Sequence, residues 1–263
     1  ICRVETAAPM VALTLDDGPT PLGAEAILPE LARHDAHATF FLIGAEAARR
    51  PGLVRAIAAA GHEVGDHSYS HVRMVGHTGR FYDREIEQTQ AALRSAGVEA
   101  VLFRPPYGKK LIGMPLAVER HGLKMILWDV EDPETGDPRV FADRVVRAAR
   151  PGSIILVHAM YGSNGVARAA LPAILDGLRE KHLKVVTVSE LLASLLPAAV
   201  RSRRNLLVVA GTDAGKTTLL RALINEIPDS ERLVTVEDAL ELQLSKHPDR
   251  HPDVVELECR EIN

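Results

Sequence analysis

The sequence predicts an α/β protein built from parallel strands that are joined by helices. Seven short apolar, β-branched runs alternate with longer helical patterns, which is typical of strand–helix–strand units. The runs are apolar almost throughout, as expected for strands that are covered on both faces. The expected strands are residues 10–15, 38–43, 62–64, 101–103, 124–130, 153–157 and 184–188.

Helical periodicity fills the intervals between these strands. A further helix is expected after the last strand, with Ser189 as its N-cap ahead of an apolar run. The other expected helices lie near residues 24–33, 45–60, 80–95, 115–121, 140–150 and 166–181.

Two architectures fit this order, an open doubly wound sheet and a closed barrel. Notable polar residues come just after the first, third, fourth, fifth and sixth strands. In a barrel those strand ends meet on one rim, where barrel enzymes place their chemistry, whereas an open sheet spreads them along an edge. The pattern therefore favours a barrel, which need not be complete.

The composition limits the classes of function. The 263 residues are 46% hydrophobic and 25% charged, and the net charge of −4 argues against a nucleic-acid binder with a broad basic surface. The two cysteines, Cys2 and Cys259, lie near opposite ends, so any metal must be held by histidine and carboxylate. No apolar run approaches the roughly 18 residues that span a bilayer, so no transmembrane segment is expected. No signal peptide is visible, but the chain begins at Ile1 rather than Met, so this says little about secretion.

The first candidate site elements are a carboxylate pair and a histidine pair. Asp16 and Asp17 precede a Gly-Pro turn and can point two oxygens into one cleft, although a surface turn has the same composition. His67 and His71 are spaced so that both imidazoles can lie on one face of a helical turn and chelate one metal. That spacing is weak evidence alone, because residues 247–251 repeat it in a polar stretch that we interpret as a loop.

Three further elements follow later strands. Arg104 precedes two prolines, which stiffen the backbone and suit a two-pronged contact with a carboxylate. Residues 128–134 form an acidic strand end, and His158 ends an apolar strand. A surface arginine, a solvated acidic loop and a core histidine are the simpler interpretations. Their joint placement at strand ends is harder to explain by chance.

The motifs TLDDGP, HSYSH, FRPPYG, the WDVE region and LVH, in this order, resemble the NodB-homology polysaccharide deacetylases of carbohydrate esterase family four. The likeness covers about residues 11–195 and includes the stretches 38–44 and 61–67. It implies a distorted, incomplete (β/α) barrel of about seven strands. It also implies a metal-dependent hydrolase that removes acetyl groups from an amino sugar or a sugar ester.

The resemblance assigns roles to individual residues. It implies three ligands for a divalent metal, usually zinc: Asp17, His67 and His71. It implies a general base, the arginine that orients it, a backbone N–H for the oxyanion and a general acid: Asp16, Arg104, Tyr107 and His158. Leu156 and Trp128 are implied to bind the substrate, Leu156 by lining the acetyl pocket. In the implied reaction, Asp16 deprotonates a metal-activated water and His158 protonates the departing amine.

One motif departs from the family. Many relatives carry an Asp-Trp pair in the fourth motif, whose aspartate is thought to orient the catalytic histidine. No such pair is present here, and Glu131, Asp132 and Glu134 are all candidates for that role.

The C-terminal segment carries a separate signal. Residues 206–218 match a phosphate-binding loop except for Ala210 at the first glycine position, and its cofactor-binding residues are Gly215, Lys216 and Thr217. Residues 200–263 resemble secretion ATPases of the type II/type IV pilus-assembly class. The likeness stops before the later strand of a complete motor domain. We therefore expect ATP and magnesium binding at most, without hydrolysis, in a truncated or fused segment at 199–263 that follows a deacetylase domain at 1–198.

The sequence leaves several points open. Peptidoglycan, chitin oligomers and acetylated xylan all remain as substrates, because rim loops set that choice. A site with two histidines and one carboxylate accepts several divalent ions besides zinc. The resemblance implies a location outside the cytoplasm or in the cell envelope. The alternatives to a deacetylase are a carbohydrate-binding pseudo-enzyme of the same fold and a nucleotide-binding fragment of a secretion ATPase.

Overall fold

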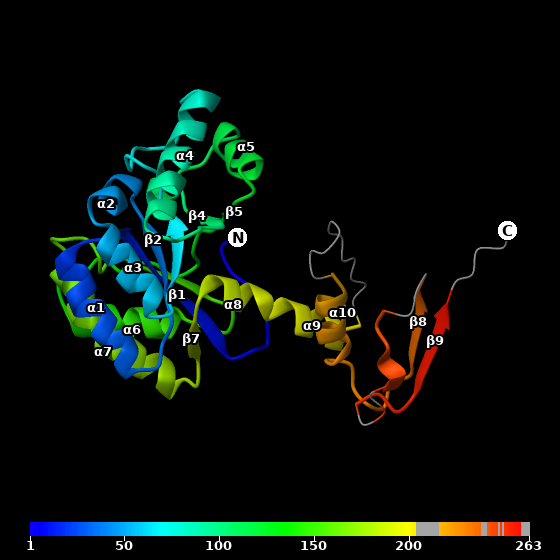
Figure 1. Cartoon of the computed structure of the whole chain (residues 1–263). Helices are drawn as coiled ribbons and strands as arrows, with labels where there is room; N and C mark the ends of the chain where they lie inside the picture. Colours follow the sequence, from blue (N-terminus) through cyan, green and yellow to red (C-terminus); the bar gives the residue numbers. More distant parts are fainter. Residues whose placement is uncertain (204–215, 238–240, 247, 249, 259–263) are drawn as a thin grey trace. The chain divides into compact units, whose positions relative to one another are not determined.

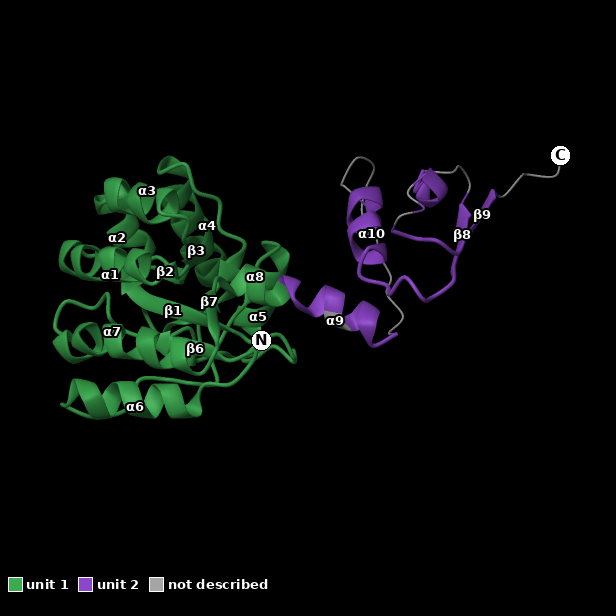
Figure 2. Cartoon of the chain, turned by 90° about the horizontal axis from the view of Figure 1, so that it is seen from below, with its two compact units in different colours: residues 1–192 green, residues 193–263 purple. Residues whose placement is uncertain are grey.

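In the computed structural model the chain forms two compact units, residues 1–192 and 193–263, which Figure 2 colours green and purple. The structure describes residues 1–203, 216–237, 241–246, 248 and 250–258. Each unit has its own sheet.

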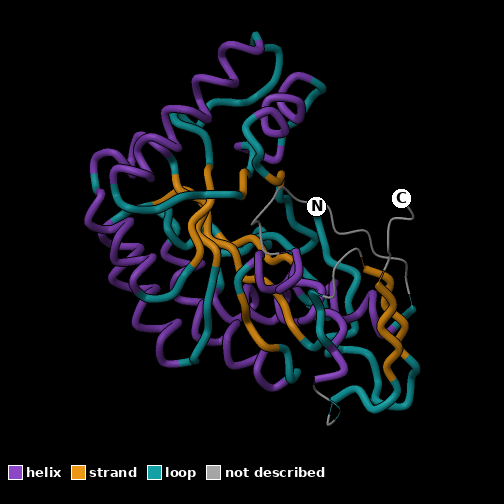
Figure 3. Tube along the Cα trace, turned by 45° about the vertical axis from the view of Figure 1, so that its right-hand side comes forward, coloured by secondary structure: helices purple, strands orange, loops and turns teal. Residues whose placement is uncertain are grey.

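All seven expected strands are present in unit 1, and they pair in parallel. They are β1 Met10–Gly18, β2 Thr39–Leu42, β3 Glu63–Asp66, β4 Leu102–Phe103, β5 Lys124–Met125, β6 Ile154–Val157 and β7 Lys184–Val186. The strand order is β5-β4-β3-β2-β1-β6, and β7 pairs with the start of β1. The sheet is curled and open (Figure 3), which confirms the prediction of a distorted, incomplete barrel.

The expected strand at 124–130 ends early, because the backbone leaves the sheet after Met125. Val130 touches β6 only through an isolated bridge to Ile155. The N-terminal residues also cross between β5 and β6. Leu127 N–H donates to the carbonyl of Ile1 at 2.7 Å, and Arg3 bridges to Ser153. The barrel is therefore incomplete between β5 and β6.

Helices cover the outer side of this sheet (Figure 1). They are α1 Pro21–Arg33, α2 Gly44–Arg49, α3 Pro51–Ala59, α4 Gly79–Ser95, α5 Gly113–Arg120, α6 Pro138–Ala148, α7 Gly165–Glu180 and α8 Val188–Ala193. The single helix expected at 45–60 is two helices. A proline disfavours helical angles in the residue before it, and Arg50 adopts φ −134° and ψ 55° ahead of Pro51.

The prediction of Ser189 as an N-cap is wrong by two residues. Thr187 Oγ1 accepts from the backbone N–H of Glu190 at 3.2 Å. The Glu190 carboxylate accepts from the backbone N–H of Thr187 at 2.8 Å, which completes a capping box. The hydroxyl of Ser189 donates to Glu63 instead.

The two faces of the sheet have different surroundings, because successive side chains in a strand alternate between faces. One set packs with the helices in the main core: Val11, Leu13, Leu15, Phe40, Leu42, Ile155 and Val157. The alternate set lies on the opposite face: Thr14, Asp16, Phe41 and Leu156. Asp16 and Leu156 of this second set line the candidate site.

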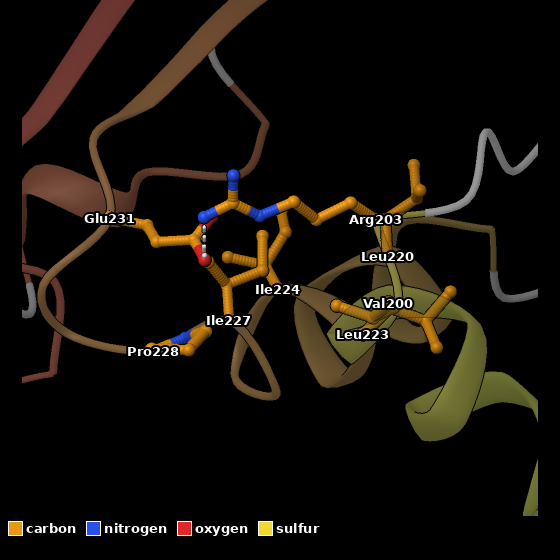
Figure 4. A pocket seen from close by; sticks show the side chains of 8 residues that line it. All are labelled: Val200, Arg203, Leu220, Leu223, Ile224, Ile227, Pro228 and Glu231. Carbon is orange, nitrogen blue, oxygen red and sulfur yellow. Dashed lines mark hydrogen bonds and ion pairs between the residues drawn. The ribbon is translucent and has the colours of Figure 1, made fainter.

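Unit 2 contains α9 Leu195–Arg201, α10 Lys216–Ile224, β8 Leu233–Glu237 and β9 Val254–Glu258, and the two strands pair in parallel. The expected boundary stretch near Pro197 is helical, since it lies in α9. Of the phosphate-binding loop expected at 206–218, residues 206–215 lie outside the described residues. An apolar pocket of about 340 Å³ lies between α9, α10 and the segment after α10, and the ion pair of Arg203 with Glu231 borders it (Figure 4).

Candidate active site

The two adjacent carboxylates of β1 reach the same pocket because the strand is irregular there. In a regular strand Asp16 and Asp17 would point to opposite faces. The register with β2 shifts between Asp16 and Gly18, and Asp17 has a φ of 67°. This bulge turns Asp17 so that both carboxylates line one pocket of about 450 Å³.

His67 and His71 are brought together by a loop rather than by the helical turn that their spacing suggests. The residues after β3 are not helical, and Ser68 and His71 have φ values of 61° and 56°. The two imidazole centroids are 4.9 Å apart. One ligand atom from each of Asp17, His67 and His71 lies within 4.8 Å of the others. The proximity predicted for these residues is therefore present, but the predicted helical turn is wrong.

These three side chains fit a divalent ion. Oδ1 of Asp17 is 3.0 Å from Nε2 of His71 and 3.5 Å from Nε2 of His67. The same buried oxygen makes no hydrogen bond of regular geometry among the described residues, although both imidazoles lie within ion-pair distance of it. Burial alone would raise the pKa of Asp17, but the two imidazoles hold it well below its usual range.

The ring of His67 is fixed from behind. Its Nδ1–H donates to the carbonyl oxygen of Arg104 at 2.8 Å, which leaves Nε2 free to face Asp17. A backbone carbonyl commonly orients a metal-binding imidazole in this way. Two imidazoles and one carboxylate leave positions for water and substrate, as a catalytic metal site requires.

Arg104 is fully buried beside Asp16. Its Nη1 donates at 2.7 Å both to Oδ1 of Asp16 and to the hydroxyl of Thr14. Its remaining donors reach the carbonyls of Ile126 and Leu127 at 3.3 Å and 3.1 Å. Burial lowers the pKa of Arg104, and the charge of Asp16 opposes that effect. The expected contact between this arginine and Asp16 is therefore present.

Among the three acidic candidates of the fourth motif, Asp132 is the one that contacts His158. Its Oδ2 lies 3.1 Å from Nδ1 of His158, and the carboxylate accepts the backbone N–H of the same histidine. Glu131 accepts from Nε1 of Trp128 at 2.8 Å instead. Glu134 also lines the pocket.

The remaining predicted residues lie around the same pocket. Leu156 is 2% exposed and lines it together with Trp128 and Tyr107. Tyr107 has a φ of 59°, and its ring centroid is 5.0 Å from that of His71. A Cβ at Gly108 would lie 2.8 Å from the Trp128 ring, so these two residues are in close contact.

The pocket stores backbone strain. Eight non-glycine residues in the described chain have a positive φ, and four of them belong to this site: Asp17, Ser68, His71 and Tyr107. Such conformations cost about 1–3 kcal/mol each and persist only where the surroundings enforce them. The residues around the site must therefore hold these four backbones in place.

Several residues at the site were not predicted. Arg73 and Lys109 line the pocket, and Asn164 donates to Asp132 at 3.5 Å. Asp66 and Glu85 accept hydrogen bonds from backbone N–H groups in the loop between His67 and His71. The signal for Glu85 was its place on the buried face of α4, in a helix whose apolar residues would otherwise occupy that face.

The predicted nucleotide residues are only partly described. Gly215 lies outside the described residues. Lys216 begins α10 and is exposed, and the hydroxyl of Thr217 donates to Glu241 at 2.8 Å. Of the second histidine pair, His247 is not described, and Nε2 of His251 is 3.2 Å from Oδ1 of Asn225.

Fold and pocket together define a half-barrel protein with hydrolase-type side chains at the carboxyl ends of its strands. A family model described as polysaccharide deacetylase matches residues 3–126, and one described as type II/IV secretion system protein matches residues 177–251. The chain is 39% identical over 160 residues to the chitooligosaccharide deacetylase of Sinorhizobium fredii, which covers 59% of this chain and 74% of the relative. It belongs to the polysaccharide deacetylase family. The secretion match begins inside α7, so it overlaps unit 1.

Two further comparisons bear on function. The peptidoglycan-N-acetylglucosamine deacetylase PgdA of Listeria monocytogenes is 32% identical over 184 residues, which span 69% of this chain but only 38% of that protein. A pseudoenzyme of carbohydrate esterase family 4 from Bacillus anthracis has a similar structure, with a TM-score of 0.68 and 29% identity. That likeness covers 73% of this chain and 68% of the pseudoenzyme chain.

Proposed function

We propose that the protein is a metal-dependent deacetylase that removes acetyl groups from a polysaccharide, with an N-acetylglucosamine polymer as the favoured substrate. The observation that carries this proposal is the convergence of Asp17, His67 and His71 on one point, with the buried Oδ1 of Asp17 left without a hydrogen bond in the described structure. Asp16 and His158 line the same pocket. This set supplies a metal site, a base and an acid.

Different residues of the pocket have different roles in the proposed hydrolysis. A divalent ion held by these three ligands, zinc by preference, would acidify a water and polarise the acetyl carbonyl. Asp16 accepts the water proton, and Arg104 holds the carboxylate of Asp16 in place through the 2.7 Å contact. The backbone N–H of Tyr107 donates to the developing oxyanion.

His158 protonates the leaving amine. Burial alone would lower its pKa, but the hydrogen bond with Asp132 and the nearby charges of Asp16, Asp132 and Asp17 raise it to about 9. The imidazole therefore carries a proton at neutral pH, as an acid requires. Asp132 takes the orienting role that the Asp-Trp pair supplies in many relatives. Leu156 and Trp128 contact the acetyl group and its sugar.

The relatives favour chitin oligomers or peptidoglycan as the substrate class, because the matched proteins are named for these polymers. Acetylated xylan is the third candidate. The cell-wall relatives also favour a location outside the cytoplasm or in the cell envelope. The helices in the described ranges are all too short or too polar to span a bilayer.

The direct test is acetate release from chitin oligomers, peptidoglycan and acetylated xylan, with zinc and with a chelator. Release that requires zinc and is lost in Asp16→Asn supports the proposal, and the preferred polymer names the substrate class. Chelator-resistant release, or none from any polymer by zinc-loaded protein, contradicts it.

The second candidate is a carbohydrate-binding pseudo-enzyme of the same fold. The likeness to a family pseudoenzyme and the absence of an Asp-Trp pair from the fourth motif favour it. Polymer binding without acetate release would select this candidate.

For the C-terminal part we propose that a deacetylase domain at 1–198 is followed by a partial P-loop segment at 199–263. The family model described as type II/IV secretion system protein supports a secretion-ATPase-like C-terminal part, although its match at residues 177–251 begins before this boundary. We expect at most nucleotide and magnesium binding at Gly215, Lys216 and Thr217. Soluble ATP turnover that disappears in Lys216→Ala would overturn this assignment.

A further inference from the structure

The loop that carries both candidate metal histidines is held in a conformation that it would not adopt alone. It runs from β3 to the segment before α4, and Ser68 and His71 both have left-handed backbones. Each such residue costs about 1–3 kcal/mol. Something outside the loop must therefore hold His67 and His71 at their mutual distance.

Glu85 of α4 makes contacts that help to hold this loop in place. The carboxylate is buried, with 4% exposure of the residue. Its Oε2 accepts the backbone N–H groups of Tyr69 and Ser70 at 3.0 Å and 2.8 Å. Its Oε1 accepts the hydroxyl of Ser70 at 2.8 Å. All three bonds reach Tyr69 and Ser70, two of the three residues between the histidines.

The start of the loop is fixed separately. Oδ1 of Asp66 accepts the backbone N–H of Ser68 at 2.8 Å, and its Oδ2 accepts from the side-chain amide of Gln90 at 3.1 Å. The hydroxyl of Ser68 then accepts the backbone N–H of His71 at 3.2 Å. The loop is thus tied at its start, and the backbone N–H groups of Gly44 and Ala45 donate to the carbonyls of Ser68 and Tyr69. Glu85 holds the N–H groups of its middle from α4.

We infer that Glu85 is a positioning residue that sets the affinity and geometry of the metal site without touching the ion. This inference rests on the proposed metal-dependent function. Groups that orient metal ligands from outside the coordination sphere typically contribute about 10- to 100-fold in metal affinity. The carboxylate of Glu85 acts through the backbone between the two histidines.

The variants Glu85→Ala and Glu85→Gln separate geometry from charge. Alanine removes all three acceptor contacts. Glutamine can present its carbonyl oxygen to the two backbone N–H groups and donate its amide to the hydroxyl of Ser70. We expect zinc affinity to fall about 10- to 100-fold in Glu85→Ala and to be largely retained in Glu85→Gln.

Glu63 provides the matched control, because it lies at the opposite end of β3 and its carboxylate contacts β2 and the start of α8. Its carboxylate accepts from the hydroxyl of Thr39 at 2.7 Å and from the backbone N–H of Ser189 at 3.2 Å. Glu63→Ala should lower the melting temperature without changing zinc affinity. The same comparison with Co²⁺ reports ligand geometry, since its visible absorption should change in Glu85→Ala alone.

The experiment is a competition titration of zinc against a chromophoric chelator, on the whole chain, below the melting temperature of every variant. Equal affinity in wild type and Glu85→Ala, or an equal loss in Glu63→Ala, overturns the inference. A wild-type protein that binds no zinc overturns the proposed metal site instead. If Glu85→Ala does not fold, amide hydrogen exchange in the metal-free wild-type protein tests the inference instead. The Tyr69 and Ser70 amides must then be protected, and fast exchange contradicts the bracing role.

Discussion

The carboxylate of Asp132 contacts His158 at two places. Oδ2 lies 3.1 Å from the ring Nδ1, and the same oxygen accepts the backbone N–H of His158 at 3.2 Å. The histidine therefore has one orientation, with its Nε2 left for a leaving group. The pairing also explains why a side chain that burial would neutralise carries a proton at neutral pH.

Asp132→Asn should lower the pKa of His158 from about 9 towards the ordinary value near 6.5. An NMR titration of the imidazole in metal-free protein measures this directly. Because the folded protein binds this proton more tightly, its stabilising contribution is full below the ordinary pKa and is lost as pH rises through about 9. Acetate release should fall about 100-fold. An unchanged titration midpoint would mean that Asp132 does not control the acid.

Arg104→Met should destabilise the fold strongly, because it leaves Asp16 buried without its cation. Breaking such a buried pair costs about 3–5 kcal/mol, to be measured as the free energy of unfolding in urea. Arg120→Met is the control, since its pair with Asp83 is largely exposed and is worth less than about 1 kcal/mol. The double variant Asp16→Asn, Arg104→Met should recover part of the loss. Similar losses for Arg104→Met and the control would refute the buried ion pair.

Gly108→Ala should displace Trp128, because the added methyl would lie 2.8 Å from its ring. Trp128 is the only tryptophan, so its fluorescence should change and acetate release should fall. Gly76 also has a positive φ, of 79°, but no atom lies within 4 Å of an added methyl. Gly76→Ala should therefore cost only about 1–2 kcal/mol of stability and leave fluorescence and activity intact. Equal behaviour of the two variants would remove Trp128 from the site.

Zinc should stabilise the folded protein in proportion to its occupancy. Binding only to the folded state at 100 times the dissociation constant contributes about 2.7 kcal/mol. The rise in melting temperature should be reversed by a chelator and should be absent in Asp17→Ala. A rise that persists in Asp17→Ala would place the ion elsewhere.

The sequence predicts the positions of the seven strands along the chain well, because each is an apolar run bounded by turn residues. The ends of helices were harder to predict. Pro51 splits one expected helix into two, and Thr187 rather than Ser189 is the N-cap of α8. Both differences follow from local backbone chemistry that a periodic pattern does not carry. The strand expected at 124–130 ends at Met125, where the chain leaves the sheet between β5 and β6. That difference comes from tertiary structure rather than from the local sequence.

The candidate site was predicted as a set of residues but not as a geometry. A motif can name Asp16 and Asp17, but only the bulge between Asp16 and Gly18 shows how adjacent carboxylates share one pocket. Three acidic residues were equivalent in sequence until the contact of Asp132 with His158 separated them. Glu85 was missed because its place on α4 signals only burial, and its partners, two backbone N–H groups and the hydroxyl of Ser70, have no signature in sequence.

Acetate release measured against zinc occupancy tests the central claim most directly. Metal-free protein is titrated with zinc, and release from chitin oligomers or peptidoglycan is followed at each step. We predict that activity rises with the first equivalent per chain and then stays level, and that Asp16→Asn binds the same equivalent without activity. Full activity in metal-free protein, or an Asp16→Asn variant as active as wild type, would contradict the account.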